Sequence, residues 1–473
     1  MKITPISGFP EYLPAERIVE QHFLDVIRET FELHGYPSIE TRAVEPVDRL
    51  LGKGGDADKE IYGITRLAGE EDPAAASDVE LGLHFDLTVP FARYVLENAG
   101  RLTFPFRRHQ VQKVWRGERP QEGRYREFTQ ADIDVVDVGE LAPHFEAEMP
   151  LVVAEVFRKL PIGRMVIQVN NRKIPEGFYR GIGIGAHDAT EIQTTLRTID
   201  KLDKVGPEKV AAMLVEAGCT DEQARKCLAL AAIRTEDLSF VDQVRALGVE
   251  HPVLDEGLET LAAVIRTGLE NAPGAMVADL RIARGLDYYT GTVYETQLVG
   301  HESWGSFCSG GRYDSLASDG RTTYPGVGIS IGVSRLLGLL LGQGLVGASR
   351  STPACVLVAV NDEEGRADST RVATALRGRG IACEVAPKPA KFGKQIRYAE
   401  RRGIPYVWFV GASEGGADQV KDIRSGEQVD ADETRWSPPA EDLRPQVYRV
   451  AEGASGGEGV SGGEGASGGE GGS

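Results

Sequence analysis

Residues 281–295 read RIARGLDYYTGTVYE, and this stretch predicts a turn that leads into a β-strand over residues 290–296. A guanidinium (Arg284), a carboxylate (Asp287) and two adjacent phenols (Tyr288 and Tyr289) come just before the strand. Ligand pockets combine a few convergent polar groups with an apolar wall. We therefore expect this stretch to line a pocket. The alternative is a buried tyrosine corner that is fixed by an arginine–aspartate pair.

A β-hairpin is predicted for residues 110–136. Two alternating segments, 110–118 and 127–136, are joined by a charged turn that contains proline and glycine. Side chains in a strand alternate between its two faces, so polar and aromatic residues should gather on the inward face. The inward residues would be Arg116, Glu118, Phe128, Gln130, Asp132 and Asp134. One charge alone would be typical of a solvated hairpin face, but convergence across two strands indicates a binding site.

Other segments before residue 340 supply further elements. Residues 15–34 predict a long amphipathic helix, because apolar side chains recur at helical spacing. Residues 81–88 are strand-like and would place Asp86 and Thr88 on one face, and a helix is expected over residues 89–98. Residues 326–337 run from a glycine-rich strand into a helix that carries Arg335 in its first turns.

Two details of local structure are also predicted. Pro150 is expected to kink or restart the helix over residues 144–160, because proline cannot donate a backbone hydrogen bond. Residues 307–314 contain two adjacent glycines and are expected to form a strand end with a glycine turn.

The predicted pattern of secondary structure changes twice along the chain. Helical patterns dominate residues 174–272, which suggests a helical insertion between two halves of a β-rich domain over residues 1–340. A linker over residues 341–352 precedes an alternating βαβαβ domain over residues 353–450. The Gly/Glu/Ser repeat over residues 451–473 lacks apolar side chains and is expected to be disordered. One helix of the βαβαβ domain presents a basic face made by Lys394, Arg397 and Arg401.

Composition limits the class of protein. A formal charge of −18 argues against a general nucleic-acid coat but allows a local basic groove. No apolar run approaches the length of a membrane span, and the first residues lack the apolar core of a secretory signal. Five scattered cysteines fit a reducing cytoplasm without structural zinc. A cytoplasmic location is therefore expected.

The motifs resemble those of the histidyl-tRNA synthetase family, within the class II aminoacyl-tRNA synthetases. Residues 115–130 are similar to motif 2 of that class, residues 281–295 to the histidine-specific signature, and residues 326–337 to motif 3. Pro46 falls where motif 1 has its dimer-interface proline. The resemblance covers residues 1 to about 450 and implies an α+β fold. It implies an antiparallel sheet flanked by helices, a helical insertion and a C-terminal α/β anticodon-binding domain.

The resemblance assigns the ATP-binding residues. It implies that Arg116 holds the α-phosphate and the substrate carboxylate, and that Arg335 holds the γ-phosphate. Glu118 would bind the adenine amino group, Phe128 would stack on adenine, and Arg124 would meet the β- and γ-phosphates or the acceptor end. The family's additional catalytic arginine corresponds to Arg284, and the implied metal is Mg²⁺ carried by ATP, with no protein metal site.

Recognition of L-histidine follows in the same way. Asp134 would accept the ring N–H, and the Tyr289 hydroxyl would complement the other ring nitrogen. The α-amino group would be bound by Asp86, Thr88 and Gln130, with the remaining contacts made by Arg116, Arg284 and Tyr288. The implied macromolecular partners are tRNA(His), bound in part by Lys394, Arg397 and Arg401, and a second copy of the chain.

Two departures from the family pattern affect this interpretation. Asp86 and Asp134 stand where many bacterial members have glutamate, and His84 stands where arginine is common. The alternatives are a non-catalytic paralogue, namely the regulatory subunit of ATP phosphoribosyltransferase, and a domain that only senses tRNA. The paralogue would be expected to lack the anticodon-binding domain and to lose arginines such as Arg116 or Arg284, and all of these are present. The presence of Arg116, Arg284 and Arg335 also argues against a domain that only senses tRNA.

Overall fold

The computed structural model describes residues 3–51, 60–65, 81–186, 188, 190–282 and 288–450. The chain divides into two compact units, residues 1–340 and 341–473. Four predicted features therefore lie outside the described residues. They are Arg284, Asp287, most of the turn before Tyr288, and the repeat over residues 451–473.

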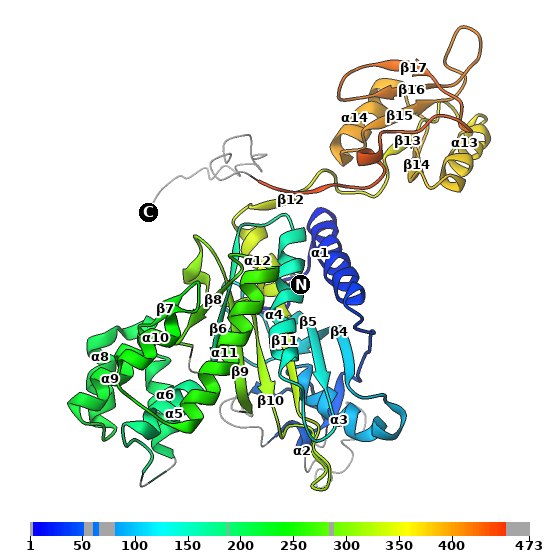
Figure 1. Cartoon of the computed structure of the whole chain (residues 1–473). Coiled ribbons are helices and arrows are strands. Elements are labelled where there is room, and N and C mark those ends of the chain that lie inside the picture. The colour runs from blue at the N-terminus through cyan, green and yellow to red at the C-terminus, as the bar shows by residue number, and fades with distance from the viewer. Residues whose placement is uncertain are drawn as a thin grey trace, which may run out of the picture. The chain divides into compact units, whose positions relative to one another are not determined.

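An eight-stranded sheet is the centre of the first unit (Figure 1). Among its described strands only β6 and β8 pair in parallel, so the predicted α+β fold with an antiparallel sheet is confirmed. The strands, in spatial order, are β4 (Phe106–Trp115), β5 (Glu127–Val136), β11 (Gly326–Gly332), β10 (Cys308–Tyr313), β9 (Tyr289–Leu298), β6 (Met165–Asn171), β8 (Met276–Asp279) and β7 (Arg234–Thr235).

Helices cover one face of this sheet. They are α1 (Pro14–Leu33), α4 (His144–Lys159), α11 (Pro252–Asn271) and α12 (Val333–Gly342). Figure 1 shows α4 and α11 side by side across the strands, and α4 also packs on α1. The helix α1 begins at Pro14, which fits the first turn, and buries Val19, Phe23, Ile27 and Phe31 at helical spacing. The buried apolar side chains under these helices form the core.

The hairpin of β4 and β5 shows how the sequence separates core from site. On β5, Ala131, Ile133 and Val135 are fully buried, while the alternating Gln130 and Asp132 belong to the opposite face. The strands pair over their whole length, from Phe106 opposite Val136 to Trp115 opposite Glu127. The apolar set packs toward the helices, so the polar set is left for the site.

Smaller elements complete the first unit. A three-stranded sheet has the order β1 (Val44–Pro46), β3 (Leu81–Leu83) and β2 (Gly63–Ile64). Near it lie α2 (Val47–Leu50), α3 (Thr88–Asn98) and a 3₁₀ turn over Ala99–Arg101. A second 3₁₀ turn, Glu302–Trp304, follows β9.

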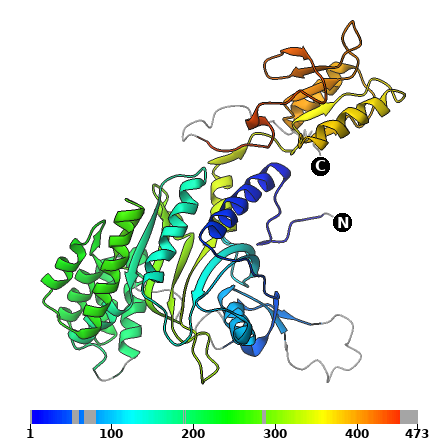
Figure 2. The same ribbon diagram turned by 45° about the vertical axis from the view of Figure 1, so that its right-hand side comes forward.

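The predicted insertion, residues 174–272, is mostly helical, but its last helix, α11, packs on strands β6, β8 and β9 of the large sheet. Its other helices are α5 (Lys173–Gly181), α6 (Thr190–Ile199), α7 (Leu202–Val205), α8 (Pro207–Glu216), α9 (Asp221–Ala231) and α10 (Ser239–Ala246). They form a group beside the β7 end of the large sheet (Figure 2).

Three local predictions are wrong in whole or in part. The helix α4 is continuous through Pro150 and does not restart there, since the packing of its neighbours outweighs one missing hydrogen bond. Strand β3 ends at Leu83, so Asp86 lies in a loop and Thr88 begins α3. The glycines Gly310 and Gly311 lie inside β10 instead of in a turn. A Cβ on Gly310 would lie 2.1 Å from the carbonyl oxygen of Gly328, so the glycine allows close strand contact.

The second unit contains a five-stranded sheet with the order β14 (Cys383–Val385), β13 (Val356–Val358), β15 (Tyr406–Phe409), β16 (Gln419–Asp422) and β17 (Gln428–Asp430). The first three strands are parallel, as the βαβαβ pattern predicts, and the last two add an antiparallel ribbon that was not predicted. Its helices are α13 (Arg366–Gly378) and α14 (Phe392–Arg402), with a 3₁₀ turn over Ala440–Asp442. Strands β12 (Val346–Ala348) and β18 (Val447–Arg449) pair with each other, so the expected linker contains a strand.

Candidate active site

Strand β5 carries a row of polar side chains above small residues of β11. Gln130 pairs with Gly332, Asp132 with Ser330, and Asp134 with Gly328. The amide nitrogen of Gln130 donates a 2.8 Å hydrogen bond to the Ser330 hydroxyl. A Cβ on Gly328 would lie 2.1 Å from Oδ1 of Asp134. The small residues of β11 therefore leave the space that these side chains occupy.

A cavity of about 250 Å³ lies at the open end of this row. Three guanidinium groups and one carboxylate give it a net positive lining. The charged lining residues are Arg116, Arg124, Arg335 and Glu118. Phe128 and Gln130 also line it, so six of the predicted ATP- and histidine-binding residues meet here. Such a lining suits an anionic ligand with an aromatic part.

Backbone carbonyls orient two of the arginines of this cavity, while Glu118 lies 3.9 Å from Nη1 of Arg116 and 3.5 Å from Nη1 of Arg124. Nε of Arg116 donates to the carbonyl of Phe85 at 2.9 Å, and its guanidinium lies 5.1 Å from the Phe128 ring centroid. Nη2 of Arg335 donates to the carbonyl of Trp304 at 2.5 Å. Burial and the nearby Arg124 lower the pKa of Arg335. Glu118 offsets only part of the positive charge of the three guanidiniums, which leaves a net positive charge that can bind phosphate.

Three buried aspartates form a second cluster next to this cavity. Asp86, Asp132 and Asp134 are between 2% and 4% exposed. Oδ1 of Asp86 accepts from the backbone N–H of Val89, in the first turn of α3, at 3.1 Å. Three acceptor atoms have no hydrogen-bond partner among the described residues: Oδ2 of Asp86, Oδ1 of Asp132 and Oε1 of Gln130. Buried acceptors without partners are costly, so they indicate a ligand with several N–H donors.

Burial also changes the ionisation of this cluster. It raises the pKa of Asp86 to about 6 and the pKa of Asp134 to about 7, and it raises the pKa of Asp132. The positive charge of Arg108 lowers the pKa of Asp134, and that of Arg116 lowers the pKa of Asp86, so both oppose the effect of burial. Perturbed carboxyl groups of this kind concentrate at functional sites.

Asp134 has two partners that the sequence reasoning missed. Nη2 of Arg108 lies 2.6 Å from Oδ2, and the Tyr313 hydroxyl donates to Oδ1 at 2.8 Å. Arg108 is the residue directly opposite Asp134 across the hairpin. The first strand of the predicted hairpin began at Gln110, whereas β4 begins at Phe106, so the prediction did not include this pair. Tyr313 lies in the Gly-Gly-Arg-Tyr-Asp segment whose strand was misread as a turn.

The two tyrosines of the signature segment complete this cluster. The rings of Tyr288 and Tyr289 are 4.9 Å apart, and the ring of Tyr288 is 6.1 Å from that of Tyr313. Burial, and for Tyr289 the charge of Asp134, raises the phenol pKa values. Both phenols therefore stay neutral near pH 7 and can donate hydrogen bonds. Thr88 lies at the start of α3, close to Asp86 in the chain.

The three predicted tRNA-binding residues lie elsewhere, and His84, to which no ligand role was assigned, makes a contact within the protein. His84 is buried and its Nε2 is 2.7 Å from the carbonyl oxygen of Lys113, a structural contact. Lys394, Arg397 and Arg401 are exposed on α14 in the second unit. Among the described residues, none of these three makes an ion pair, so their charge is available to a partner.

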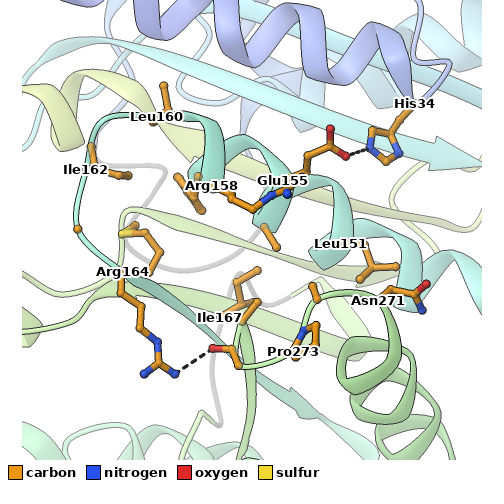
Figure 3. A pocket seen from close by; sticks show the side chains of 17 residues that line it. His34, Leu151, Glu155, Arg158, Leu160, Ile162, Arg164, Ile167, Asn271 and Pro273 are labelled. Atoms are coloured by element: carbon orange, nitrogen blue, oxygen red, sulfur yellow. Dashed lines mark hydrogen bonds and ion pairs between the residues drawn. The ribbon is translucent and has the colours of Figure 1, made fainter. Parts of the chain in front are cut away.

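A larger cavity, of about 790 Å³, lies away from this site (Figure 3). It is bounded by the ends of α1 and α4, the start of β6 and the turn after α11. His34 pairs with Glu155, and Arg164 donates to the carbonyl of Gly274. None of the predicted site residues that the structure describes lines it. Volume alone is a poor guide here, because the smaller cavity holds the convergent polar groups.

Two kinds of feature are absent from the described part of the chain. No helix there is long and apolar enough to cross a membrane. No group of three or more His, Cys, Asp or Glu side chains there is arranged to hold a metal ion.

Comparison with known proteins gives consistent results. A family model for histidyl-tRNA synthetase matches residues 8–336, and a model for an anticodon-binding domain matches residues 354–435. The chain is 60% identical over 458 residues to a histidine–tRNA ligase of Micrococcus luteus, which covers 94% of this chain and 99% of the relative. It is 57% identical over 454 residues to the histidine–tRNA ligase of Cutibacterium acnes, covering 94% of this chain and 99% of that one. The crystal structure of histidyl-tRNA synthetase from Nostoc superposes with a TM-score of 0.81 at 37% identity, over 91% of this chain and 97% of that chain.

Proposed function

Since the chain belongs to the histidyl-tRNA synthetase family and ligates histidine to tRNA, we propose that both steps of this reaction occur at the site built on β5. In the first step, histidine and ATP form histidyl-adenylate and pyrophosphate. In the second, the 3′ end of tRNA(His) takes the histidine and AMP leaves. The match to an anticodon-binding domain and the named relatives favour this ligase over a non-catalytic paralogue or a tRNA sensor.

ATP would occupy the arginine-lined cavity. Arg116 would bind the α-phosphate, and Arg124 and Arg335 would bind the β- and γ-phosphates, since planar guanidiniums bind phosphate oxygens in pairs. Phe128 would stack on adenine, and Glu118 would accept from its amino group. Support comes from the three guanidiniums that line one small cavity. Glu118 is its only carboxylate among the described lining residues, so Mg²⁺ would be held mainly by the phosphates of ATP.

Histidine would bind over the aspartate cluster. Its α-ammonium group has three N–H donors, and Asp86, Asp132 and Gln130 offer three acceptor atoms without partners among the described residues. The Thr88 hydroxyl would be an alternative acceptor for one of these three N–H donors. Asp134 would accept the ring N–H and the Tyr289 hydroxyl would donate to the other ring nitrogen, with Tyr288 as part of the wall. A site with these polar groups rejects amino acids without ring nitrogens by roughly 10⁴-fold or more.

The adenylation step needs stabilisation of developing negative charge. A carboxylate oxygen of histidine attacks the α-phosphorus, the bond to the β-phosphate bridging oxygen breaks, and pyrophosphate leaves. Arg116 would stabilise the charge on the α-phosphate from the cavity side. Arg284, which lies outside the described residues, is proposed to act from the signature segment. Asp287 keeps no assigned role.

The second unit would bind the anticodon arm of tRNA(His). Its exposed basic helix α14 would contact phosphates through Lys394, Arg397 and Arg401, because phosphate contacts supply much of the affinity for nucleic acids. The helical insertion would contact the acceptor arm. We also propose that the chain forms a homodimer through the segment that contains Pro46, and that it acts in the cytoplasm.

One observation supports the proposal most strongly. A single strand, β5, carries Phe128 and Gln130 at the arginine-lined cavity and Asp132 and Asp134 in the aspartate cluster. This arrangement would bring the carboxylate of histidine to the α-phosphate of ATP. The test is ATP–pyrophosphate exchange by the intact chain with each of the twenty amino acids. Exchange should require histidine, and exchange that is absent or equally rapid with other amino acids would refute the proposal.

A further inference from the structure

Arg108 is a fully buried guanidinium beside the proposed histidine site. It is 0% exposed, and its Nη2 atom is 2.6 Å from Oδ2 of Asp134 and 4.0 Å from Oδ2 of Asp132. Its guanidinium also lies 4.4 Å from the ring centroid of Phe91, and Nη2 is 3.4 Å from the carbonyl oxygen of Leu87. The contacts with Phe91 and Leu87 hold it against the wall of α3.

Two other nitrogen atoms of Arg108 have no partner among the described residues. Nε and Nη1 are both buried and make no hydrogen bond there. A guanidinium has five N–H donors and no acceptor, so these donors can be satisfied only by a group with lone pairs. A protonated imidazolium ring has only donors and a positive charge, so the Arg108 cation beside Asp134 disfavours it relative to the neutral ring.

The charges around Asp134 come from every element that packs on it. Arg108 faces it from β4, Asp132 from its own strand, Tyr289 from β9, Tyr313 from β10 and Asp86 from the loop before α3. Its neighbour on β11 is Gly328, which contributes no charge. Arg116, on the cavity side, lowers the pKa of Asp86 and of Asp132. Arg108 is thus the only cation among the described groups that contacts the Asp134 carboxylate.

We propose that Arg108 is a positioning and specificity-determining residue, which holds Asp134 as an oriented carboxylate and makes the pocket select histidine with a neutral ring. This inference rests on the proposed histidine site. Without Arg108, carboxylates would be the only charged groups among the described residues that face Asp134. Such a site would either bind a proton at Asp134 or attract the imidazolium form of histidine.

The ionisation of the cluster agrees with this role. Burial raises the pKa of Asp134 to about 7, and Arg108 is the first of the neighbours that oppose the rise. An adjacent arginine lowers the pKa of a carboxyl group by about 1–3 units. Removal of Arg108 should therefore raise the pKa of Asp134 further, so that the carboxyl group is mostly protonated at neutral pH and no longer accepts the ring N–H.

The test is the pH dependence of kcat/KM for histidine in ATP–pyrophosphate exchange. The variants are Arg108→Met, which removes the charge, and Arg108→Lys, which keeps it. The second substrate is the histidine analogue with a 1,2,4-triazole ring. Its weakly basic ring stays neutral over the pH range, so any change in its pH profile comes from ionisation of the protein and not of the substrate. Thermal melting of each variant shows whether it folds.

The expected result is a shift of the acidic limb to higher pH by about one unit or more in Arg108→Met, with both substrates. At pH 7 the KM for histidine should rise about tenfold or more, while the KM for ATP stays within about twofold. Arg108→Lys should recover most of the activity. If Arg108→Met does not fold, Arg108→Gln takes its place. The acidic limb of Arg108→Lys should then still lie within about half a pH unit of the acidic limb of the intact chain.

Two outcomes would overturn the inference. One is a pH profile of Arg108→Met or Arg108→Gln that coincides with that of the intact chain. The other is a decrease in rate that is equal at every pH and is not recovered by lysine, which would make Arg108 a purely structural residue. Failure of the proposed function would give a different result. In that case the intact chain itself would show no histidine-dependent ATP–pyrophosphate exchange.

Discussion

The hydroxyl of Tyr313, on β10, donates a 2.8 Å hydrogen bond to Oδ1 of Asp134, on β5. Strand β11 lies between these two strands, and at this place it contributes Gly328 and Gly326. A Cβ on Gly326 would lie 2.6 Å from the Tyr313 ring. The absence of side chains at these two positions of the middle strand thus allows the outer two to meet, and it fixes the orientation of the proposed ring-binding carboxylate.

Replacement of Tyr313 by phenylalanine should weaken histidine binding. The hydroxyl lowers the pKa of Asp134 and orients it, and a hydrogen bond to a charged group contributes about 1.5–3 kcal/mol. We expect KM for histidine at pH 7 to rise about tenfold in exchange assays. The control is Tyr324→Phe, in a buried ring that stacks on Phe104. Equal KM values for Tyr313→Phe and the intact chain would contradict the prediction.

Replacement of Gly328 by alanine should disturb the same carboxylate by steric contact. The added Cβ would lie 2.1 Å from Oδ1 of Asp134, so the aspartate must move away from Arg108 and Tyr313. We expect a lower melting temperature and a rise of about tenfold or more in KM for histidine. The matched control is Gly378→Ala at the end of α13, where nothing lies within 4 Å of the added atom among the described residues. An unchanged KM in Gly328→Ala would show that the close contact does not matter.

Replacement of Asp86 by asparagine should stabilise the unliganded protein while it weakens histidine binding. Burial raises the pKa of Asp86 to about 6 from an ordinary value of 3.8, so the folded state binds the proton more tightly than the unfolded state. The buried carboxylate therefore costs stability as pH rises from 3.8 through 6. The full cost, roughly 3 kcal/mol at most, applies above that range.

Melting temperatures between pH 4 and pH 8 test this prediction. Asp86→Asn should melt higher than the intact chain at pH 8, and the difference should shrink below pH 6 and vanish near pH 4. Asp242→Asn, at an exposed position in α10, is the control and should show no such trend. A pH-independent difference for Asp86→Asn would mean that the charge of Asp86 is not the cause.

The part of the site that was predicted is the part carried by strand periodicity and specific motifs. The alternation over residues 127–136 placed Gln130, Asp132 and Asp134 on one face, and the structure has them there. Arg335 was expected in the first turns of a helix and lies at the third position of α12. These features depend on local spacing, which a sequence displays directly.

Long-range partners were not predicted, because they depend on register and tertiary packing. Arg108 meets Asp134 only through the pairing of β4 with β5. Asp86 was placed on a strand, but that strand ends at Leu83 since the chain turns to begin α3. The glycines Gly310 and Gly311 were read as a turn, although close contact between strands is the reason for them. Local patterns do not distinguish these two uses of glycine.

Neutralisation of the basic face of α14 should affect tRNA and not adenylation. We expect Lys394→Ala combined with Arg397→Ala to raise KM for tRNA(His) in aminoacylation. The slope of log kcat/KM against log salt should decrease by about 0.7–0.9 for each phosphate that the variant no longer binds. Exchange in the absence of tRNA should be unchanged. Arg371→Ala on α13, where the side chain pairs with Glu433, is the control and should leave charging unaltered. Unchanged charging in the double variant would show that the tRNA binds another face.

The most direct test of the assigned ATP site is histidine-dependent ATP–pyrophosphate exchange by Arg116→Ala beside the intact chain. Arg116 lines the cavity and is oriented by the carbonyl of Phe85 at 2.9 Å, so its removal should deprive the α-phosphate of its charged donor. The expected result is a folded variant whose exchange rate at saturating substrates is about 10²–10³ times lower than that of the intact chain. A rate within about twofold of the intact chain would contradict the assignment of this cavity as the place of adenylation.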